Sequence, residues 1–214
     1  MTALPNDIYT EPDFDVDTLN NLGPLTGMAG IWEGARGLDV HPILTGPEKQ
    51  AFVERVELQP IDPQTNGPQL FYGLRYHTHI VKVGEVATFH DQVGYWLWEP
   101  ATGTVMQTLA IPRGQIAMAI GTATADAKVF ELVAVRGSEI SGICSNPFLE
   151  AAFKTVEFRI KVKINGDGTW SYEEDTVLMI PGHEGPFHHT DRNTLKKIGD
   201  PTPNPQARES AGSR

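Results

Sequence analysis

The clearest pattern in the chain is a strict alternation of apolar and charged side chains over residues 156–164. Its apolar positions, each separated from the next by a charged residue, are Val156, Phe158, Ile160, Val162 and Ile164. Because neighbouring side chains of a strand point to opposite faces, this pattern predicts a strand with one buried face and one wet face. The turn residues 165–168, Asn-Gly-Asp-Gly, follow it and predict a tight hairpin into the next strand.

Similar runs recur along the chain. They cover residues 27–36, 52–58, 70–81, 85–91, 93–99, 104–111, 115–122, 129–135, 169–180 and 187–198. The turns between most of them are too short for the crossovers that a parallel sheet requires, so the sheet is expected to be antiparallel. A sheet of so many strands tends to close, since closure removes exposed edges. We therefore expect an all-β fold, a closed antiparallel up-and-down β-barrel of about ten strands of the lipocalin and fatty-acid-binding-protein type.

The two ends of the chain differ in composition from the predicted barrel. Residues 1–23 are largely polar and interrupted by prolines, which predicts an N-terminal arm or one helical turn on the surface. Residues 200–214 hold three prolines and small polar side chains, so we expect a disordered tail. The ligand-binding barrel domain is then residues 24–199, with helix expected only over residues 146–154 and in the arm.

The charge of the chain limits its partners. The net charge is −10, from 17 Lys and Arg against 27 Asp and Glu. Phosphate backbones and anionic lipids would repel such a chain, so we expect no nucleic acid and no membrane as partner. No apolar run approaches the roughly 20 residues of a membrane-spanning helix, and the first residues lack a secretory signal, which favours a cytoplasmic protein. A barrel of this width has room for one small-molecule ligand, and the sequence leaves a monomer and a homodimer both open.

The histidines are the most informative candidates for chemistry, because neutral imidazole is a common ligand of iron and zinc. His77 and His79 lie two residues apart on one face of the run 70–81, a spacing that can hold one metal ion. Arg75 shares their face and the apolar residues share the other, so the pattern places both imidazoles outside. An interior built for a polar ligand would give the same pattern, and both interpretations stay open.

Other histidines lie in or beside the predicted strands. His90 stands in the polar segment after residue 88, and His188 and His189 open the last run. Only one of these two adjacent residues can face the interior of a barrel. A nearby carboxylate such as Asp175 or Asp191 could then fix the tautomer of the ligating imidazole.

Two further residues are candidates for ligand contact. Arg113 lies in a bend between two apolar runs, where its guanidinium could meet a ligand carboxylate or face solvent. Glu174 shares the parity of Trp170 and Tyr172, which predicts an acid inside the barrel. The sequence holds no Gly-x-Ser-x-Gly, P-loop or Rossmann glycine motif, so covalent catalysis and nucleotide binding are disfavoured.

Four segments together carry a family resemblance. They are residues 25–34 with the Gly-Ile-Trp-Glu-Gly strand, residues 89–95 with His-Asp-Gln-Val-Gly-Tyr, residues 109–114 with Pro-Arg-Gly, and residues 194–198. In this order they resemble the nitrobindins, haem-binding β-barrels that include the C-terminal domain of a human THAP protein and were earlier labelled fatty-acid-binding-like. The resemblance implies a ten-stranded barrel that binds ferric haem b through one histidine of the last strands. It also implies reactivity toward nitric oxide or peroxynitrite, of the peroxynitrite isomerase type.

One position departs from the family's pattern. Counting back without gaps from Leu195 places Thr190 where the family's iron-binding histidine stands, with His189 one residue early. A shift of one residue moves a side chain to the opposite face of a strand. Either a β-bulge returns His189 to the interior, or this chain has lost the iron ligand.

Three hypotheses follow. The leading one is a haem-binding barrel in which His189, or else His188, ligates the iron. The residues expected around the haem are His188, His189, Thr190, His90 and Arg113. The second is a non-haem barrel in which His77, His79 and a third ligand such as His90 or His189 hold a divalent metal ion. The third is a carrier of an apolar or acidic small molecule, of the fatty-acid-binding-protein type, without chemistry.

Overall fold

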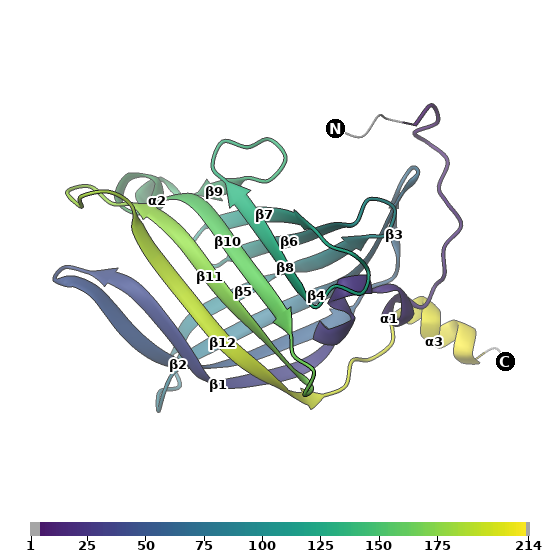
Figure 1. The fold of residues 1–214 in the computed structure, drawn as a ribbon, viewed down its shortest axis with the longest axis horizontal. Helices are drawn as coiled ribbons and strands as arrows, with labels where there is room; N and C mark the ends of the chain where they lie inside the picture. The colour runs from purple at the N-terminus through teal and green to yellow at the C-terminus, as the bar shows by residue number, and fades with distance from the viewer. Residues whose placement is uncertain (1–4, 213–214) are drawn as a thin grey trace.

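The described part of the chain, residues 5–212 of a computed structural model, folds into a β-barrel (Figure 1). Ten of its strands form the wall: β1 (Gly30–Ile43), β2 (Gly46–Pro60), β4 (Gln69–Lys82), β5 (Thr88–Glu99), β6 (Thr104–Ile111), β7 (Gln115–Thr122), β8 (Val129–Val135), β10 (Lys154–Ile164), β11 (Thr169–Met179) and β12 (Phe187–Gly199). Each pairs antiparallel with its neighbours, and the β2–β4 and β1–β12 pairings close the ring. The predicted closed up-and-down barrel is confirmed.

Shorter elements complete the fold. They are α1 (Thr18–Asn21), the 3-10 helix η1 (Gly23–Met28), β3 (Gln64–Asn66), β9 (Ile143–Ser145), α2 (Pro147–Ala152) and α3 (Pro205–Gly212). The predicted hairpin at residues 165–168 is present, with Gly168 at a φ of 79°. The helix expected near residue 146 is α2, whose N-cap Asn146 accepts hydrogen bonds from two backbone N–H groups. Within residues 5–212, no helix combines the length and the apolar character needed to cross a bilayer.

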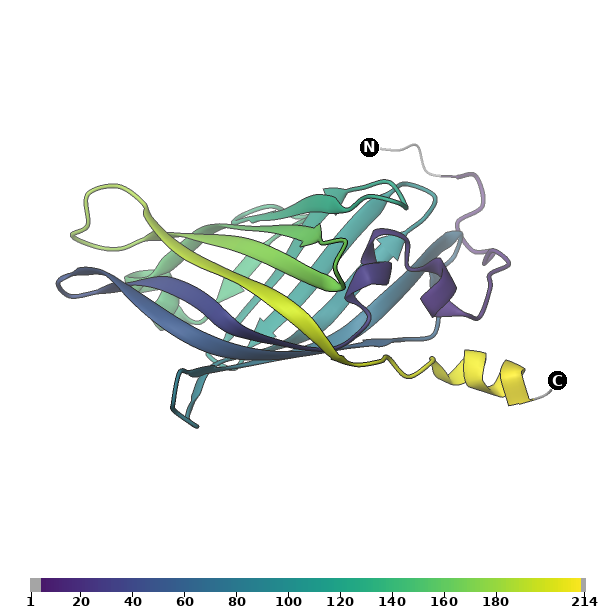
Figure 2. The same ribbon diagram turned by 60° about the horizontal axis from the view of Figure 1, so that its bottom comes forward.

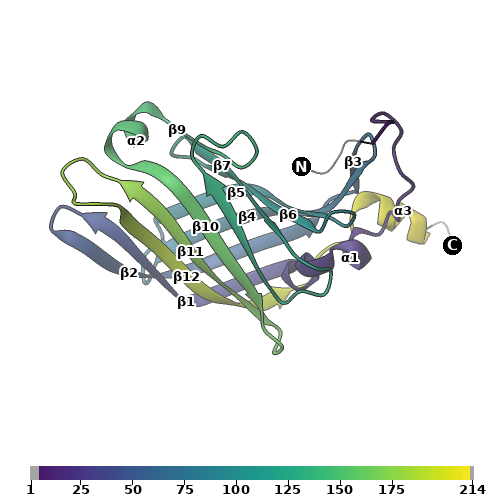
Figure 3. The same ribbon diagram turned by 45° about the horizontal axis from the view of Figure 1, so that its top comes forward.

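The N-terminal segment closes one end of the barrel. Leu22, Leu25 and Met28 are fully buried and pack into the same core as the strands. The carbonyl of Met28 also accepts a 2.7 Å hydrogen bond from the indole of Trp32. In Figures 1 and 3, α1 lies at the end of the barrel from which the two termini extend. The end of the expected surface arm is therefore part of the core, because its apolar residues fill the barrel end.

The C-terminal segment differs from the expected disordered tail over its described residues. Asn204 is 1% exposed, and its side chain bonds the backbone of Val16 and Thr18 and the carboxylate of Asp62. Helix α3 follows this anchor and extends away from the barrel, as Figure 2 shows. The hydrogen bonds of the buried Asn204 amide offset the conformational entropy that the segment loses when it becomes ordered. Composition alone does not reveal these hydrogen bonds.

The opposite end of the barrel, which we call the mouth, is formed by the β1–β2, β4–β5, β6–β7 and β11–β12 hairpins and by α2. Figure 2 shows two of these hairpins, β1–β2 and β11–β12, extending beyond the wall. Near the mouth, β7 pairs with the short β9 in place of β8. Gln115 to Ala117 pair with residues 143–145 of β9, whereas Ile120, farther along β7, pairs with Val133 of β8. Strand β9 and helix α2 thus cover the side of the wall where β7 and β8 separate.

A bulge in β1 decides which side chains of that strand face inward. Trp32 and Gly34 are buried in the first half of the strand, and Gly37 and Asp39 in the second half, so the inward parity changes. The register of β1 with β2 shifts between Gly34 and Gly37, and its register with β12 shifts over the same stretch. One extra residue in β1 therefore turns Asp39 into the barrel.

Candidate functional site

A cavity of about 570 Å³ opens at the mouth and reaches into the middle of the barrel. Its walls include large apolar side chains, among them Phe52, Ile80, Trp96, Leu109 and Phe158. Polar residues are gathered at the mouth and along the inner part of the cavity. A concave, largely apolar space with a few convergent polar groups is the usual form of a small-molecule site.

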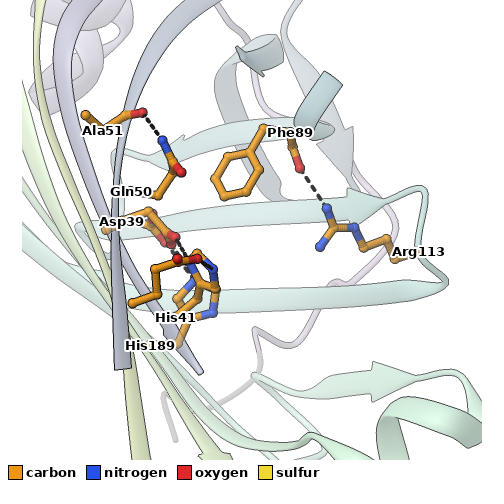
Figure 4. Close-up of polar contacts among 9 residues, drawn as sticks. Asp39, His41, Gln50, Ala51, Phe89, Arg113 and His189 are labelled. Atoms are coloured by element: carbon orange, nitrogen blue, oxygen red, sulfur yellow. Dashed lines mark hydrogen bonds and ion pairs between the residues drawn. The ribbon is translucent and has the colours of Figure 1, made fainter. Parts of the chain in front are cut away.

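Asp39 is the centre of the polar cluster at the mouth. Its carboxylate is 3% exposed and accepts hydrogen bonds from two imidazoles: Nε2 of His189 at 2.7 Å and Nδ1 of His41. The second nitrogen of His41 lies 3.1 Å from the carboxylate of Glu48, at the surface. Figure 4 shows His41 and His189 side by side against Asp39. Strands β1 and β12 supply the three residues that form this cluster.

Strand β12 places His189 inside and its neighbours outside. Its pairing with β11 runs without a shift from Thr169 opposite Lys196 to Leu178 opposite Phe187, so no bulge in that pairing is required. His189 lines the cavity, and Thr190 lines a groove on the outer wall. His188 is exposed and bonds Asp175 at 2.7 Å on the same outer face. His189 therefore faces the cavity without the β-bulge that the sequence pattern required for an inward His189, and the bulge in β1 acts on Asp39 instead.

The electrostatics of the cluster favour a positive charge on His189. Burial alone would lower the pKa of His189, but the hydrogen bond to Asp39 and the negative charges of Asp191 and Asp39 raise it above its usual value. Burial also opposes the charge of Asp39, yet the hydrogen bond and charge of His189 hold the pKa of that carboxyl below its usual value. Burial and the charge of Glu174 raise the pKa of Asp191.

Arg113 and His90 line the cavity across the mouth from the Asp39 cluster. The Arg113 guanidinium donates a 2.7 Å hydrogen bond to the carbonyl of Phe89, as Figure 4 shows. The Phe89 ring in turn lies 6.1 Å from the ring of His41, between centroids. His90 bonds Gln92 at 3.3 Å, and burial lowers the pKa of its imidazole, which favours the neutral form. Arg113 and His90 are therefore brought to the same cavity as His189.

His77 and His79 are not brought to the cavity. Both lie on the outer face of β4, where His77 bonds Asp91 at 2.9 Å and His79 bonds the Thr88 hydroxyl at 3.1 Å. The outward placement follows the hydrophobic pattern of the strand. Within residues 5–212, the one group of side chains with the geometry to share a metal ion is Asp39, His189 and Asp191, whose ligand atoms lie within 4.8 Å of one another.

Sequence reasoning missed Asp39, His41 and Glu54 as members of the cavity. Asp39 and His41 lie two residues apart, the same spacing that drew attention to His77 and His79, so a signal was present. What the pattern could not supply is the partner, because Asp39 meets His189 across 150 residues of sequence. The prediction of an inward Glu174 agrees with its place in the cavity wall.

Comparisons with known proteins agree with this architecture. The crystal structure of Rv2717c from M. tuberculosis is similar to this chain, with a TM-score of 0.57 and 24% sequence identity over 86% of this chain and 99% of that chain, which shows a shared fold. A search of curated proteins gives no match. Residues 21–197 match the model of the THAP4-like, heme-binding beta-barrel domain. This match covers most of the sequence, and the chain belongs to the family of THAP4-like, heme-binding beta-barrel domains.

Proposed function

We propose that the barrel binds haem b in the cavity at its mouth, with His189 as the iron ligand. The observation that carries the proposal is the orientation of His189: its ring lines the cavity while Nε2 donates to the buried carboxylate of Asp39. Ligating histidines usually donate their second ring nitrogen to such a carboxylate, which fixes the tautomer and raises the basicity of the ring. The other nitrogen, Nδ1, would bind the iron with loss of its proton, because only the neutral ring has a lone pair for a metal.

The size and the apolar lining of the cavity also suit a large, mostly apolar group. The cavity volume of about 570 Å³ lies in the range of sites for ligands of drug size. Phe52, Ile80 and Leu109 supply an apolar lining that excludes water. Ferric haem carries one unit of positive charge, which the carboxylate beside His189 would balance. Membership of a family named for haem binding supports the same assignment.

The residues across the mouth suggest a small anionic or diatomic reactant, and we propose nitric oxide or peroxynitrite. Bound iron would supply the redox and ligand-binding chemistry. Arg113, through the N–H groups not used by Phe89, can orient an anion entering the mouth. His90, held neutral by its burial, can donate or accept a hydrogen bond beside it. The apolar wall keeps bulk water from the reacting group.

A hemin titration of the full chain tests the cofactor assignment. We expect a Soret band that saturates at one equivalent of hemin and is lost in His189→Ala. The matched control is His188→Ala, the adjacent outward residue, which should leave the band unchanged. No band in the wild type, or equal loss in both variants, would overturn the assignment. Stopped-flow mixing of the loaded protein with peroxynitrite then tests reactivity, with Arg113→Met expected to slow the decay.

The Asp39, His189 and Asp191 group favours a second candidate, a non-haem divalent metal site. Two carboxylates and one imidazole, with ligand atoms within 4.8 Å of one another, are a donor set that suits zinc, manganese or ferrous iron. Metal analysis of the purified protein separates the two candidates. Asp191→Asn should abolish uptake of a divalent ion if that candidate is right, and should leave the Soret band in place if His189 binds haem.

A further inference from the structure

The inner part of the cavity holds a polar group that the mouth site does not use. We call it the acid floor and define it as Glu54, Glu174, Tyr76, Tyr172 and Gln107, all of which line the cavity. Glu174 pairs with Asp191 across β11 and β12, and Glu54 bonds Asn193, so both acids lie deeper along the barrel than His189. The acid floor is therefore the surface that a second small ligand would meet.

Part of the acid floor has hydrogen-bonding capacity that the described protein does not satisfy. Gln107 is 2% exposed, and its Oε1 has no hydrogen-bond partner, although its Nε2 reaches the hydroxyl of Tyr76 at 3.5 Å. Glu174 makes no side-chain hydrogen bond within residues 5–212, whereas Glu54 accepts from Tyr172 at 2.8 Å and from Asn193 at 2.9 Å. A buried acceptor without a donor is costly, and native structures keep few of them. Oε1 of Gln107 is such a buried acceptor, and the half-buried carboxylate of Glu174 is a second acceptor in the cavity wall without a donor among the described residues.

The acid floor also lacks a positive charge. Among the described residues that line the cavity, the one arginine or lysine is Arg113, which lies at the mouth and bonds Phe89. Burial raises the pKa of Glu54 to about 7 and, together with the charge of Glu54, raises the pKa of Glu174 to about 8. Each carboxylate is thus poor at holding its charge without a cation nearby.

The walls around the acid floor are aromatic. Trp170 and Tyr172 lie 6.0 Å apart, and Tyr76 and Trp96 lie 6.4 Å apart, between ring centroids. The faces of such rings attract cations, most strongly where water is excluded. Aromatic rings beside carboxylates are a combination that recognises an organic ammonium group.

We propose that the acid floor is a binding subsite for a small primary ammonium compound, whose N–H groups donate to Glu174 and to Oε1 of Gln107. The ammonium charge is balanced by the two acids, and an apolar body of the ligand lies against the aromatic walls. A primary ammonium supplies three donors, which a quaternary ammonium and an alcohol of the same size do not. This inference goes beyond the proposed haem site and does not depend on it.

Calorimetric titration of the hemin-free full chain tests the subsite with three probes that share a benzyl group: benzylammonium, benzyl alcohol and benzyltrimethylammonium. We expect benzylammonium to bind roughly 10- to 100-fold more tightly than the alcohol, because it adds charge-assisted hydrogen bonds. The quaternary probe should bind more weakly than the primary one. Equal affinity for benzylammonium and benzyl alcohol would overturn the proposal. Because no hemin is present, the result is independent of the Soret test.

Two variants locate the binding. Glu174→Gln keeps the shape of the side chain and should lower benzylammonium affinity roughly 10- to 100-fold while leaving the alcohol unchanged. Glu173→Gln is the matched control, since Glu173 is the exposed neighbour on the same strand. Unchanged affinity in Glu174→Gln would also overturn the proposal. If Glu174→Gln does not fold, Gln107→Met removes the unsatisfied acceptor and is judged by the same comparison.

Discussion

At the scale of single residues, Asp39 holds the mouth together. One of its oxygens accepts from His189 and the other from His41, so a single carboxylate fixes the rings of two strands. Its burial makes these hydrogen bonds stronger than they would be in water. On the outer face of the wall, the neighbouring residue His188 forms a similar pair with Asp175. The carboxylate of the inner pair is almost fully buried and that of the outer pair is partly exposed, so the two pairs can be compared directly.

Replacement of Asp39 by Asn should weaken hemin binding. The amide is nearly isosteric but lacks the negative charge that orients and polarises His189. We expect a loss of roughly 10- to 100-fold in hemin affinity, the usual effect of removing such a partner. Asp175→Asn removes the carboxylate of the outer pair and should leave hemin affinity unchanged. The measurement is a Soret titration; equal affinities in the two variants would contradict a role for Asp39 in holding the ligand.

Glu54 should make the stability of the fold fall as pH rises. Its pKa is about 7 in the folded protein against 4.5 as a free side chain, so the folded state binds the proton more tightly than the unfolded state. This stabilising contribution is complete below pH 4.5 and is lost as pH rises through about 7. The shift from 4.5 to about 7 corresponds to on the order of 3 kcal/mol.

Urea unfolding at pH 5 and pH 8 measures that contribution. Tyr172 and Asn193 donate hydrogen bonds to Glu54. Because the nearby Glu174 also has a raised pKa, the fall in stability between pH 5 and pH 8 should be smaller in Glu54→Gln but not abolished. Glu57→Gln, on the outer face of the same strand, should behave as the wild type. An unchanged pH dependence in Glu54→Gln would show that the carboxyl does not titrate in this range.

At the scale of elements, the bulge of β1 determines the composition of the site. Alternation predicts where the strands lie, because each strand has one buried face. The turn residues 165–168 predict the hairpin that joins β10 and β11. It cannot predict a change of parity inside a strand, since Gly34 and Gly37 have no side chain to mark a face. Without the extra residue, Asp39 would face solvent and His189 would lose its partner. The sequence therefore predicted His189 as a candidate but not the carboxylate that orients it.

A side chain at Gly37 should destabilise the fold. A Cβ at this position would lie 2.0 Å from Cε2 of Phe52, a fully buried ring that would have to shift. Gly37→Ala should lower the free energy of unfolding by about 1–3 kcal/mol, as overpacked core substitutions do. Gly166→Ala is the control, because a Cβ added to Gly166 would meet no atom within 4 Å. Chemical denaturation of both variants gives the difference; equal stabilities would contradict the close approach of Gly37 to Phe52.

At the scale of the whole molecule, the barrel has one closed and one open end. Alternation predicts the wall, but the closed end depends on apolar residues of a helical segment that has no period of two. Leu22, Leu25 and Met28 are therefore found only when the strands are assembled around them. The C-terminal segment reaches the same end through Asn204, whose partners are in distant parts of the chain. Composition alone could not predict either packing.

Truncation of an apolar side chain at the closed end should lower the free energy of unfolding as much as a truncation elsewhere in the core. Leu25 is fully buried, so Leu25→Ala should lower the free energy of unfolding by about 2–5 kcal/mol. Leu44→Ala, in the fully exposed tip of the β1–β2 hairpin, should change it by less than about 0.5 kcal/mol. Guanidinium unfolding followed by tryptophan fluorescence measures both. A small effect of Leu25→Ala would mean that the N-terminal segment is not part of the cooperative fold.

The closed end also sets the order in which ligands can enter and leave the barrel. With Leu22, Leu25 and Met28 sealing one end, whatever reaches the acid floor has to enter and leave past His189. An amine on the floor and a haem at the mouth would then load and unload in sequence, the last to arrive being the first to depart. An amine that is bound before hemin is added should stay trapped beneath the haem. Its dissociation rate should then equal the dissociation rate of the haem.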